Sequence, residues 1–135
     1  MDRLDEIAAG FRSVDDELRI QLLLDYARKL PPVPDRLEAE AETHRVHECM
    51  TPLWLWVESN EDKTLRLFIK VAEEAPTIRG IAGILVHALD GKHRADFEAI
   101  PDDLIARLGL GNILRMNRAV GIAALIGRIR RAAAA

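Results

Sequence analysis

The chain has 135 residues, of which 49% are hydrophobic and 30% are charged, and 19 basic against 22 acidic side chains give a net charge of −3. This length and composition predict one domain over residues 1–135 with its own hydrophobic core, and they exclude a chain that is disordered throughout. The charge balance argues against a nucleic-acid partner, and the single cysteine excludes an internal disulfide or a metal cluster held by this chain's thiolates alone.

The sequence predicts neither a targeting signal nor a membrane partner. Residues 1–6 are rich in acidic side chains, whereas a signal peptide begins with basic ones. The longest uncharged apolar stretch, residues 119–127, is far shorter than the roughly 20 residues that a membrane span needs. We therefore expect a cytoplasmic protein whose thiol stays reduced.

Helical signals dominate the first part of the chain. Ser13–Asp16 fits the capping box, in which a hydroxyl and a carboxylate bind free backbone N–H groups at a helix start. Apolar residues then recur at four-residue steps from Val14 to Leu22, as on one face of a helix. Prolines between residues 31 and 34 end this helix. Residues 35–44 are polar and are predicted to form a loop that accommodates a helical turn.

The middle of the chain has the two-residue period of β-strands. Residues 53–57 form a short apolar run, residues 59–63 form a polar turn, and apolar residues alternate with others through residues 65–71. These segments predict an antiparallel hairpin. Residues 45–49 are predicted to add a third strand before it.

The last part of the chain is again helical. A helix pattern begins at Pro76 and ends before Gly91, which is free to adopt the left-handed conformation of a helix cap. A short helix follows Pro101 and ends at Gly109, and the last helix carries apolar residues over 122–129. The predicted fold class is α+β: N-terminal helices, a small antiparallel three-stranded sheet, and C-terminal helices packed on it.

The only cysteine lies outside any apolar stripe. Cys49 follows the polar residues 44–48 and precedes a predicted turn at residues 50–52. If this segment is a strand, Arg45 and His47 share a face with Cys49 and favour its thiolate. The alternative is a buried structural thiol, because free cysteine packs as a small hydrophobic residue. The residues alone leave both interpretations open.

Metal binding is not expected. His44, His47 and Cys49 place three potential zinc ligands close together. A structural zinc site needs four protein ligands and a catalytic one three, and the known spacings of both differ from this one. Residues 109–111 lack the third glycine and the preceding strand of a phosphate-binding loop.

A family resemblance rests on these same residues. Residues 46–54, Val-His-Glu-Cys-Met-Thr-Pro-Leu-Trp, resemble the active-site segment of the SufE family, whose pattern is roughly Val-x-Gly-Cys-x-Ser-x-Val-Trp. Residues 75–81 resemble the start of a family helix, and residues 118–122 resemble its Arg-x-x-Gly-apolar motif. The resemblance extends from about residue 5 to residue 131 and places the only cysteine on the motif's cysteine.

The resemblance implies a sulfur acceptor in iron–sulfur cluster assembly with a helix–sheet–helix α+β fold. SufE proteins take persulfide sulfur from a SufS-like cysteine desulfurase that uses pyridoxal phosphate, stimulate that enzyme, and pass the sulfur to an iron–sulfur scaffold protein. The chain would then be a carrier rather than an enzyme, with Cys49 as its catalytic thiol and no cofactor of its own. The resemblance also implies partner-binding or loop-supporting roles for His47, Thr51, Trp54, Arg79 and Arg118.

The chain departs from the family pattern beside the cysteine. Glu48 stands where the family usually has glycine, which places a negative charge next to a thiol that must ionise. Thr51 keeps the hydroxyl of the family's serine, and Pro52 stiffens the segment. A further hypothesis is that apolar neighbours shelter the thiol in a pocket, namely Met50, Leu53 and Trp54.

A second class of function stays open beside the sulfur acceptor. The same fold also suits a non-covalent binding or regulatory module whose cysteine is inert or redox-regulatory. A Cys49→Ser variant separates the two, because only the carrier loses its function. A scaffold that assembles clusters itself is disfavoured, since it needs several thiolate ligands and this chain has one cysteine.

Overall fold

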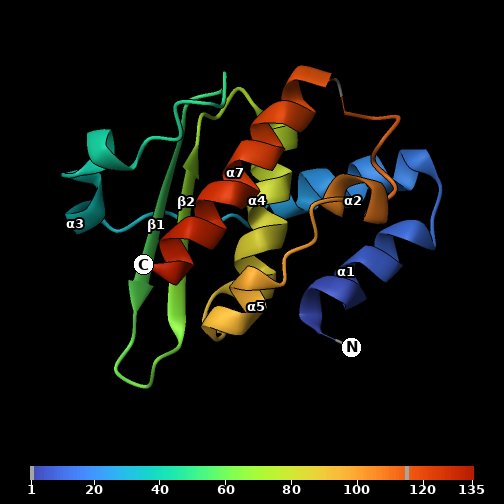
Figure 1. Cartoon of the computed structure of the whole chain (residues 1–135). Helices are drawn as coiled ribbons and strands as arrows, with labels where there is room; N and C mark the ends of the chain where they lie inside the picture. Colours follow the sequence, from blue (N-terminus) through green and yellow to red (C-terminus); the bar gives the residue numbers. More distant parts are fainter. Residues whose placement is uncertain (1, 115) are drawn as a thin grey trace.

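The computed structural model describes residues 2–114 and 116–135. Helices precede and follow a small antiparallel sheet, so the predicted α+β class is confirmed (Figure 1). The elements in chain order are α1 (Arg3–Arg12), α2 (Asp16–Arg28), α3 (Asp35–Glu38), the 3-10 helix η1 (Ala41–His44), β1 (Leu53–Ser59), β2 (Leu65–Val71), α4 (Pro76–Leu89), α5 (Arg94–Glu98), α6 (Leu104–Arg107) and α7 (Met116–Ala134). None of the helices in the described part of the chain combines the length and apolar character that crossing a bilayer requires.

The predicted hairpin is confirmed. β1 and β2 pair antiparallel, with Leu53 opposite Val71 and Ser59 opposite Leu65. Alternate residues of β2 are buried against the helices, as the two-residue period predicts. The predicted left-handed glycine is also present, because Gly91 has φ of 83° and lies in the turn after α4.

The predicted third strand at residues 45–49 is wrong, because the sheet has two strands. Only Arg45 forms a β-bridge to β1, and the Val46 N–H donates to the Leu53 carbonyl at 2.9 Å. The chain then turns, and the Cys49 N–H donates back to the Val46 carbonyl at 3.2 Å. A turn this close to the bridge prevents a second rung of strand pairing, so the cysteine lies on a loop.

α4 lies at the centre of the core. It packs on α2 and β2, while α7 packs on β1 from the same side of the sheet (Figure 1). Two glycines let α4 approach α2 closely: a Cβ on Gly80 would lie 2.5 Å from the Leu23 carbonyl oxygen, and one on Gly83 would lie 2.2 Å from that of Tyr26. The helix pair is therefore in backbone contact, which only residues without a side chain allow.

The short helices α3 and η1 cover the other face of the sheet. A second apolar cluster forms there, centred on Leu37, Trp56 and Phe68. Arg36 on α3 donates two hydrogen bonds of 2.8 Å to the Glu58 carboxylate on β1. The segment that the sequence predicts as a loop is therefore a short helical cap, fixed to the sheet by packing and by ion pairs.

Candidate functional site

Cys49 is buried against the last helix. Only 5% of its surface is exposed, and it belongs to the main core cluster. The neighbour that matters is Gly121 on α7: an ideal Cβ built there would lie 2.9 Å from the Cys49 sulfur and 3.7 Å from the Cys49 Cβ. The sulfur thus occupies the space that any other residue at position 121 would fill. We call this contact the Gly121 seat.

The loop that carries the thiol, residues 47–52, is anchored at its two ends. The backbone pair between Val46 and Leu53 closes its base, and the Pro52 carbonyl accepts a hydrogen bond of 3.0 Å from the Ala72 N–H beyond β2. Val46 and Leu53 are fully buried, which fixes these anchors in the core. Between the anchors, Met50 extends into solvent with 82% of its surface exposed. The loop therefore buries its sulfur and exposes the next side chain.

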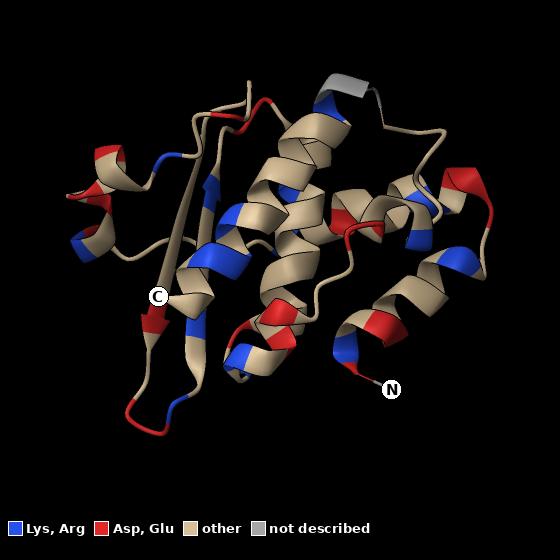
Figure 2. Ribbon diagram, in the orientation of Figure 1, with Lys and Arg blue, Asp and Glu red and all other residues tan. Residues whose placement is uncertain are grey.

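An ion pair joins the loop tip to α7 at a second point. A carboxylate oxygen of Glu48 lies 3.7 Å from a guanidinium nitrogen of Arg128. Arg128 follows Gly121 by about two helical turns, so both contacts lie on the same face of α7. Figure 2 shows the basic positions along the second half of this helix. Because both side chains are partly exposed, this pair contributes little to stability.

Two arginines brace the secondary structure next to the loop. Arg79 on α4 donates a hydrogen bond of 2.9 Å to the carbonyl of Val71, the last residue of β2. Arg118 on α7 donates one of 2.8 Å to the hydroxyl of Thr77 and so joins the first turns of α7 and α4. Arg118 lies one turn before Gly121, so this bond helps to fix the helix that forms the seat.

The expected grouping of cations around the thiol is wrong. Without a third strand, Arg45 and His47 do not share a face with Cys49. Arg45 instead packs over the Trp54 ring, with its guanidinium carbon 5.8 Å from the ring centre, and Lys70 approaches the same ring at 5.5 Å. His47 is exposed at the turn. The loop turns the Cys49 side chain into the core, whereas Arg45 packs over Trp54 and His47 faces solvent.

The thiol is sheltered, but two of the three residues that the sequence predicts for the shelter lie elsewhere. Met50 points away from the core, and Trp54 packs with the cluster on the other face of the sheet. Leu53 is buried at the loop base, and Thr51 is half-buried. α7 contributes to the shelter through Gly121, a contact between distant parts of the chain. Across residues 2–114 and 116–135, no three His, Cys, Asp or Glu side chains gather closely enough to hold a metal ion.

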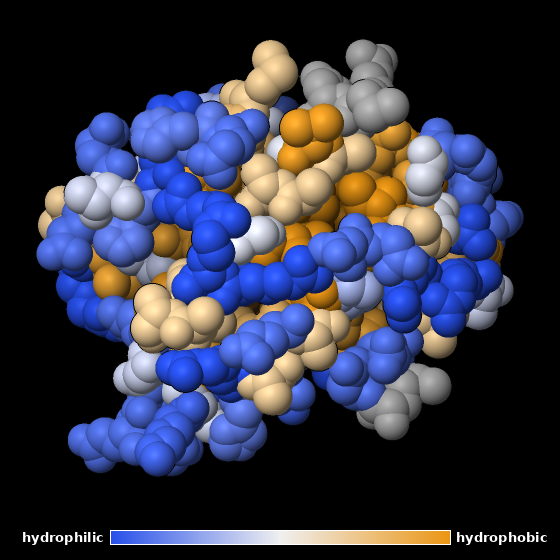
Figure 3. Space-filling model, in the orientation of Figure 1, coloured by the Kyte–Doolittle hydropathy of each residue, from blue (hydrophilic) through white to orange (hydrophobic). Residues whose placement is uncertain are grey.

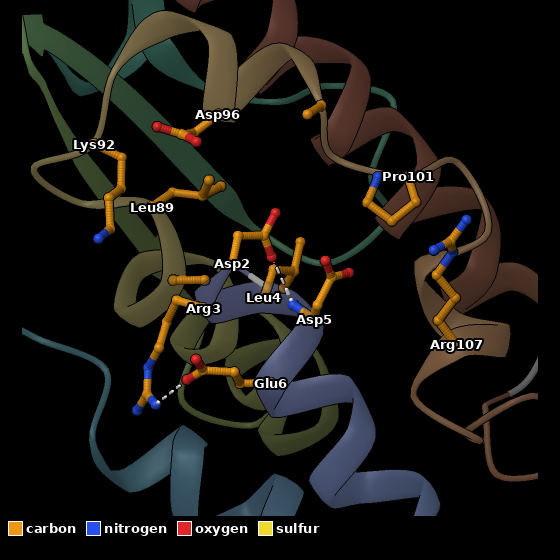
Figure 4. A pocket seen from close by; sticks show the side chains of 12 residues that line it. Asp2, Arg3, Leu4, Asp5, Glu6, Leu89, Lys92, Asp96, Pro101 and Arg107 are labelled. Atoms are coloured by element: carbon orange, nitrogen blue, oxygen red, sulfur yellow. Dashed lines mark hydrogen bonds and ion pairs between the residues drawn. The ribbon is translucent and has the colours of Figure 1, made fainter.

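A pocket of about 580 Å³ lies elsewhere, between the start of α1, the end of α4 and the segment from α5 to α6 (Figure 4). Its lining mixes acidic and basic side chains, some of which pair with one another, as Arg3 and Glu6 do at 3.5 Å. None of the residues that the sequence predicts for the site is among those that line it. The pocket and the thiol are therefore separate features.

Comparisons with known proteins agree with this combination of an α+β fold and one thiol on a loop. The model of the SufE family, described as an Fe-S metabolism associated domain, matches residues 5–133. The chain belongs to the SufE family.

Curated relatives and a solved structure support the same placement. An uncharacterized SufE-like protein of Mycobacterium tuberculosis is 38% identical over 128 residues, which are 95% of this chain and 89% of that protein. The sulfur acceptor protein CsdE of Escherichia coli is 30% identical over 112 residues, which are 82% of this chain and 72% of CsdE. The solution structure of a hypothetical protein from Thermus thermophilus superposes with a TM-score of 0.84 at 33% identity, covering 99% of this chain and 96% of that one.

Proposed function

We propose that this protein is a sulfur acceptor in iron–sulfur metabolism and that Cys49 carries the sulfur as a persulfide. The observation that carries the proposal is the position of the chain's only cysteine on an anchored loop, in a SufE-family fold that CsdE, a protein named as a sulfur acceptor, shares. Sulfur transfer between thiols needs a reachable thiolate rather than a full catalytic cleft. A loop with fixed ends and one buried thiol can supply this by a local movement.

The chemical step is a thiolate exchange at sulfur. The donor is the persulfide of a cysteine desulfurase, whose pyridoxal phosphate releases sulfur from free cysteine. After losing its proton to solvent, Cys49 attacks the outer sulfur of that persulfide. A sulfur–sulfur bond forms on Cys49, the donor's sulfur–sulfur bond breaks, and the donor cysteine leaves as a thiolate. The sulfur moves without net oxidation or reduction, so the step needs no cofactor on this chain.

The loop must open for this step to occur. With 5% of its surface exposed, Cys49 cannot reach a sulfur atom on another protein from the Gly121 seat. The anchors at Val46 and Pro52 confine the movement to the residues between them. The persulfide then passes to a downstream acceptor, which we propose is an iron–sulfur scaffold protein.

Exposed apolar side chains mark where the desulfurase docks. Met50, with 82% exposure, directly follows the thiol, and Val120, with 56%, directly precedes its seat. Figure 3 shows apolar surface over the first turns of α7. A partner that covers both side chains gains apolar burial and contacts the loop residue next to the thiol. We propose this surface as the desulfurase contact.

The test compares wild type with Cys49→Ser in a desulfurase turnover assay. A desulfurase from the same organism is supplied with free cysteine, and the rate of alanine formation is measured with each protein added. Wild type is expected to raise the rate severalfold, and Cys49→Ser to leave it at the basal level while still binding the desulfurase. Equal stimulation by both proteins would contradict the carrier role and favour the alternative, a non-covalent regulatory module.

A further inference from the structure

We propose that Gly121 is the positioning residue of the acceptor thiol, because its missing side chain creates the space that holds the Cys49 sulfur and keeps the loop closed. A side chain at position 121 would therefore expose Cys49 while α7 stays in place. The role of this closed loop in sulfur transfer rests on the proposed function. The closed seat itself can be tested without any desulfurase.

The argument starts from which atoms a methyl group at position 121 would meet. The nearest atom is the Cys49 sulfur at 2.9 Å, closer than carbon and sulfur approach in proteins, whereas the Cys49 Cβ at 3.7 Å and Cα at 3.8 Å are at ordinary contact distance. The conflict therefore concerns one atom. Removing the sulfur would remove the conflict, and retaining it forces either the loop or the helix to move.

The loop is the part that gives way. α7 is fixed by residues that are almost fully buried after the seat, such as Ile122 and Leu125, and by the hydrogen bond from Arg118 to Thr77. The loop tip is held to α7 by the seat and by the ion pair between Glu48 and Arg128 at 3.7 Å, which is weak because it is partly exposed. A methyl group at position 121 thus favours the open loop.

A matched control lies on the same helix. At Gly127 an added Cβ would meet the Arg131 guanidinium at 3.3 Å, which is the far end of a flexible side chain. Gly127→Ala thus makes the same chemical change and the same gain in helix propensity without touching the loop. Any difference between Gly121→Ala and Gly127→Ala then reports on the seat.

The first measurement is the rate at which iodoacetamide alkylates Cys49 in the folded, reduced protein, followed by intact mass. Since local opening limits access to a buried thiol, Gly121→Ala should react about tenfold faster than wild type, and Gly127→Ala within about twofold of it. A Gly121→Ala protein that is folded by circular dichroism and reacts no faster than wild type would overturn the proposal.

A double-mutant cycle decides the case in which Gly121→Ala folds poorly. In a Cys49→Ala background the sulfur is gone, and the nearest atom to a methyl group at position 121 is a Cβ at 3.7 Å. The drop in urea midpoint caused by Gly121→Ala should then vanish or reverse. An equal drop in both backgrounds would overturn the proposal, since the methyl group would then disturb something other than the thiol.

The two proposals fail in different ways. If the seat is wrong, the alkylation ratio and the cycle show it, while wild type still stimulates the desulfurase. If the sulfur-acceptor role is wrong, wild type and Cys49→Ser act alike on the desulfurase, while the alkylation ratio keeps its expected value.

Discussion

Two neighbouring segments precede β1, and the protein holds them in very different ways. The helical cap, α3 and η1, is fixed to the outer face of the sheet by Trp56, which is 2% exposed, and by two short ion pairs. Arg36 binds Glu58 at 2.8 Å, and Lys70 binds Glu38 at 2.7 Å. Among the described residues, the contacts of the Cys49 loop with α7 include its sulfur atom against Gly121 and a longer ion pair between Glu48 and Arg128.

The strongly held cap contributes to stability, whereas the weakly held loop leaves the thiol able to react. Burying an aromatic side chain contributes several times as much free energy as burying one thiol, because the hydrophobic contribution scales with buried apolar area. We therefore expect the cap to open only when the sheet unfolds and the loop to open in a protein that is otherwise folded. A buried thiol that must become reachable requires the second kind of attachment.

The largest expected effect is a loss of stability caused by a substitution beneath the helical cap. Trp56→Ala should lower the free energy of unfolding by about 3–5 kcal/mol, because it empties the centre of the outer cluster. Urea denaturation measures the loss, and iodoacetamide alkylation of the protein that remains folded should keep the wild-type rate. A loss below about 1 kcal/mol would mean that the cap does not depend on this side chain.

A second prediction concerns the exposed part of the loop. Met50→Asp should weaken binding to a resting desulfurase about tenfold, since it places a charge in the apolar contact, and should leave stability within about 0.5 kcal/mol of wild type. Leu18→Asp, at an exposed apolar residue of α2, is the control and should bind as wild type does. Equal weakening by both variants would show that the desulfurase does not dock at the loop.

A smaller effect is expected at the ion pair. Glu48→Gln removes the attraction to Arg128 and should raise the alkylation rate of Cys49 by about twofold or less at low salt. The difference from wild type should disappear near about 0.5 M salt, where exposed charges are screened. An increase as large as that of Gly121→Ala would make the ion pair, and not the seat, the main restraint.

The smallest effect is the pH dependence of the cap. Two hydrogen bonds from Arg36 lower the pKa of Glu58, and burial opposes them only in part. A lowered pKa in the folded state means that the pair stabilises the fold above the ordinary glutamate pKa, and that this stability is lost as the pH falls through the lowered value. Arg36→Met should therefore cost at most about 1 kcal/mol at neutral pH and nothing at strongly acidic pH, by urea denaturation at each pH. A cost that does not change with pH would show that Arg36 acts through packing.

Most helices of the fold follow from local sequence patterns, and the exceptions are informative. The periodic helix at residues 76–89 is confirmed at both ends. The start of α2 is displaced, because Asp15 rather than Ser13 caps it and accepts from the Leu18 N–H at 3.0 Å. α1 was not predicted, although Asp2 caps it by accepting a hydrogen bond of 2.8 Å from the Asp5 N–H. The helix predicted from Ser13 onward leaves α1 out, and the structure has two separate helices, each with its own aspartate cap.

In the functional site, too, local sequence predicts some features, and others depend on contacts between distant parts of the chain. The resemblance identified Cys49 and the glycine motif of α7 separately, but no pattern within either segment predicts that the sulfur lies against Gly121. That contact, like the ion pair of Glu48 with Arg128, joins residues far apart in the chain and depends on how α7 crosses the sheet. The prediction of a third strand is wrong for a related reason. Residues 45–49 alternate as a strand does, but the chain turns after Val46 and carries Cys49 into the core.

The most direct test of the central claim is the intact mass of this protein after incubation with a cysteine desulfurase and free cysteine in the absence of reductant. The account predicts a gain of one sulfur atom, about 32 Da, on wild type, its removal by added thiol, and no gain on Cys49→Ser. An unchanged mass of wild type beside a desulfurase that is active and bound to it would contradict the claim that Cys49 accepts sulfur.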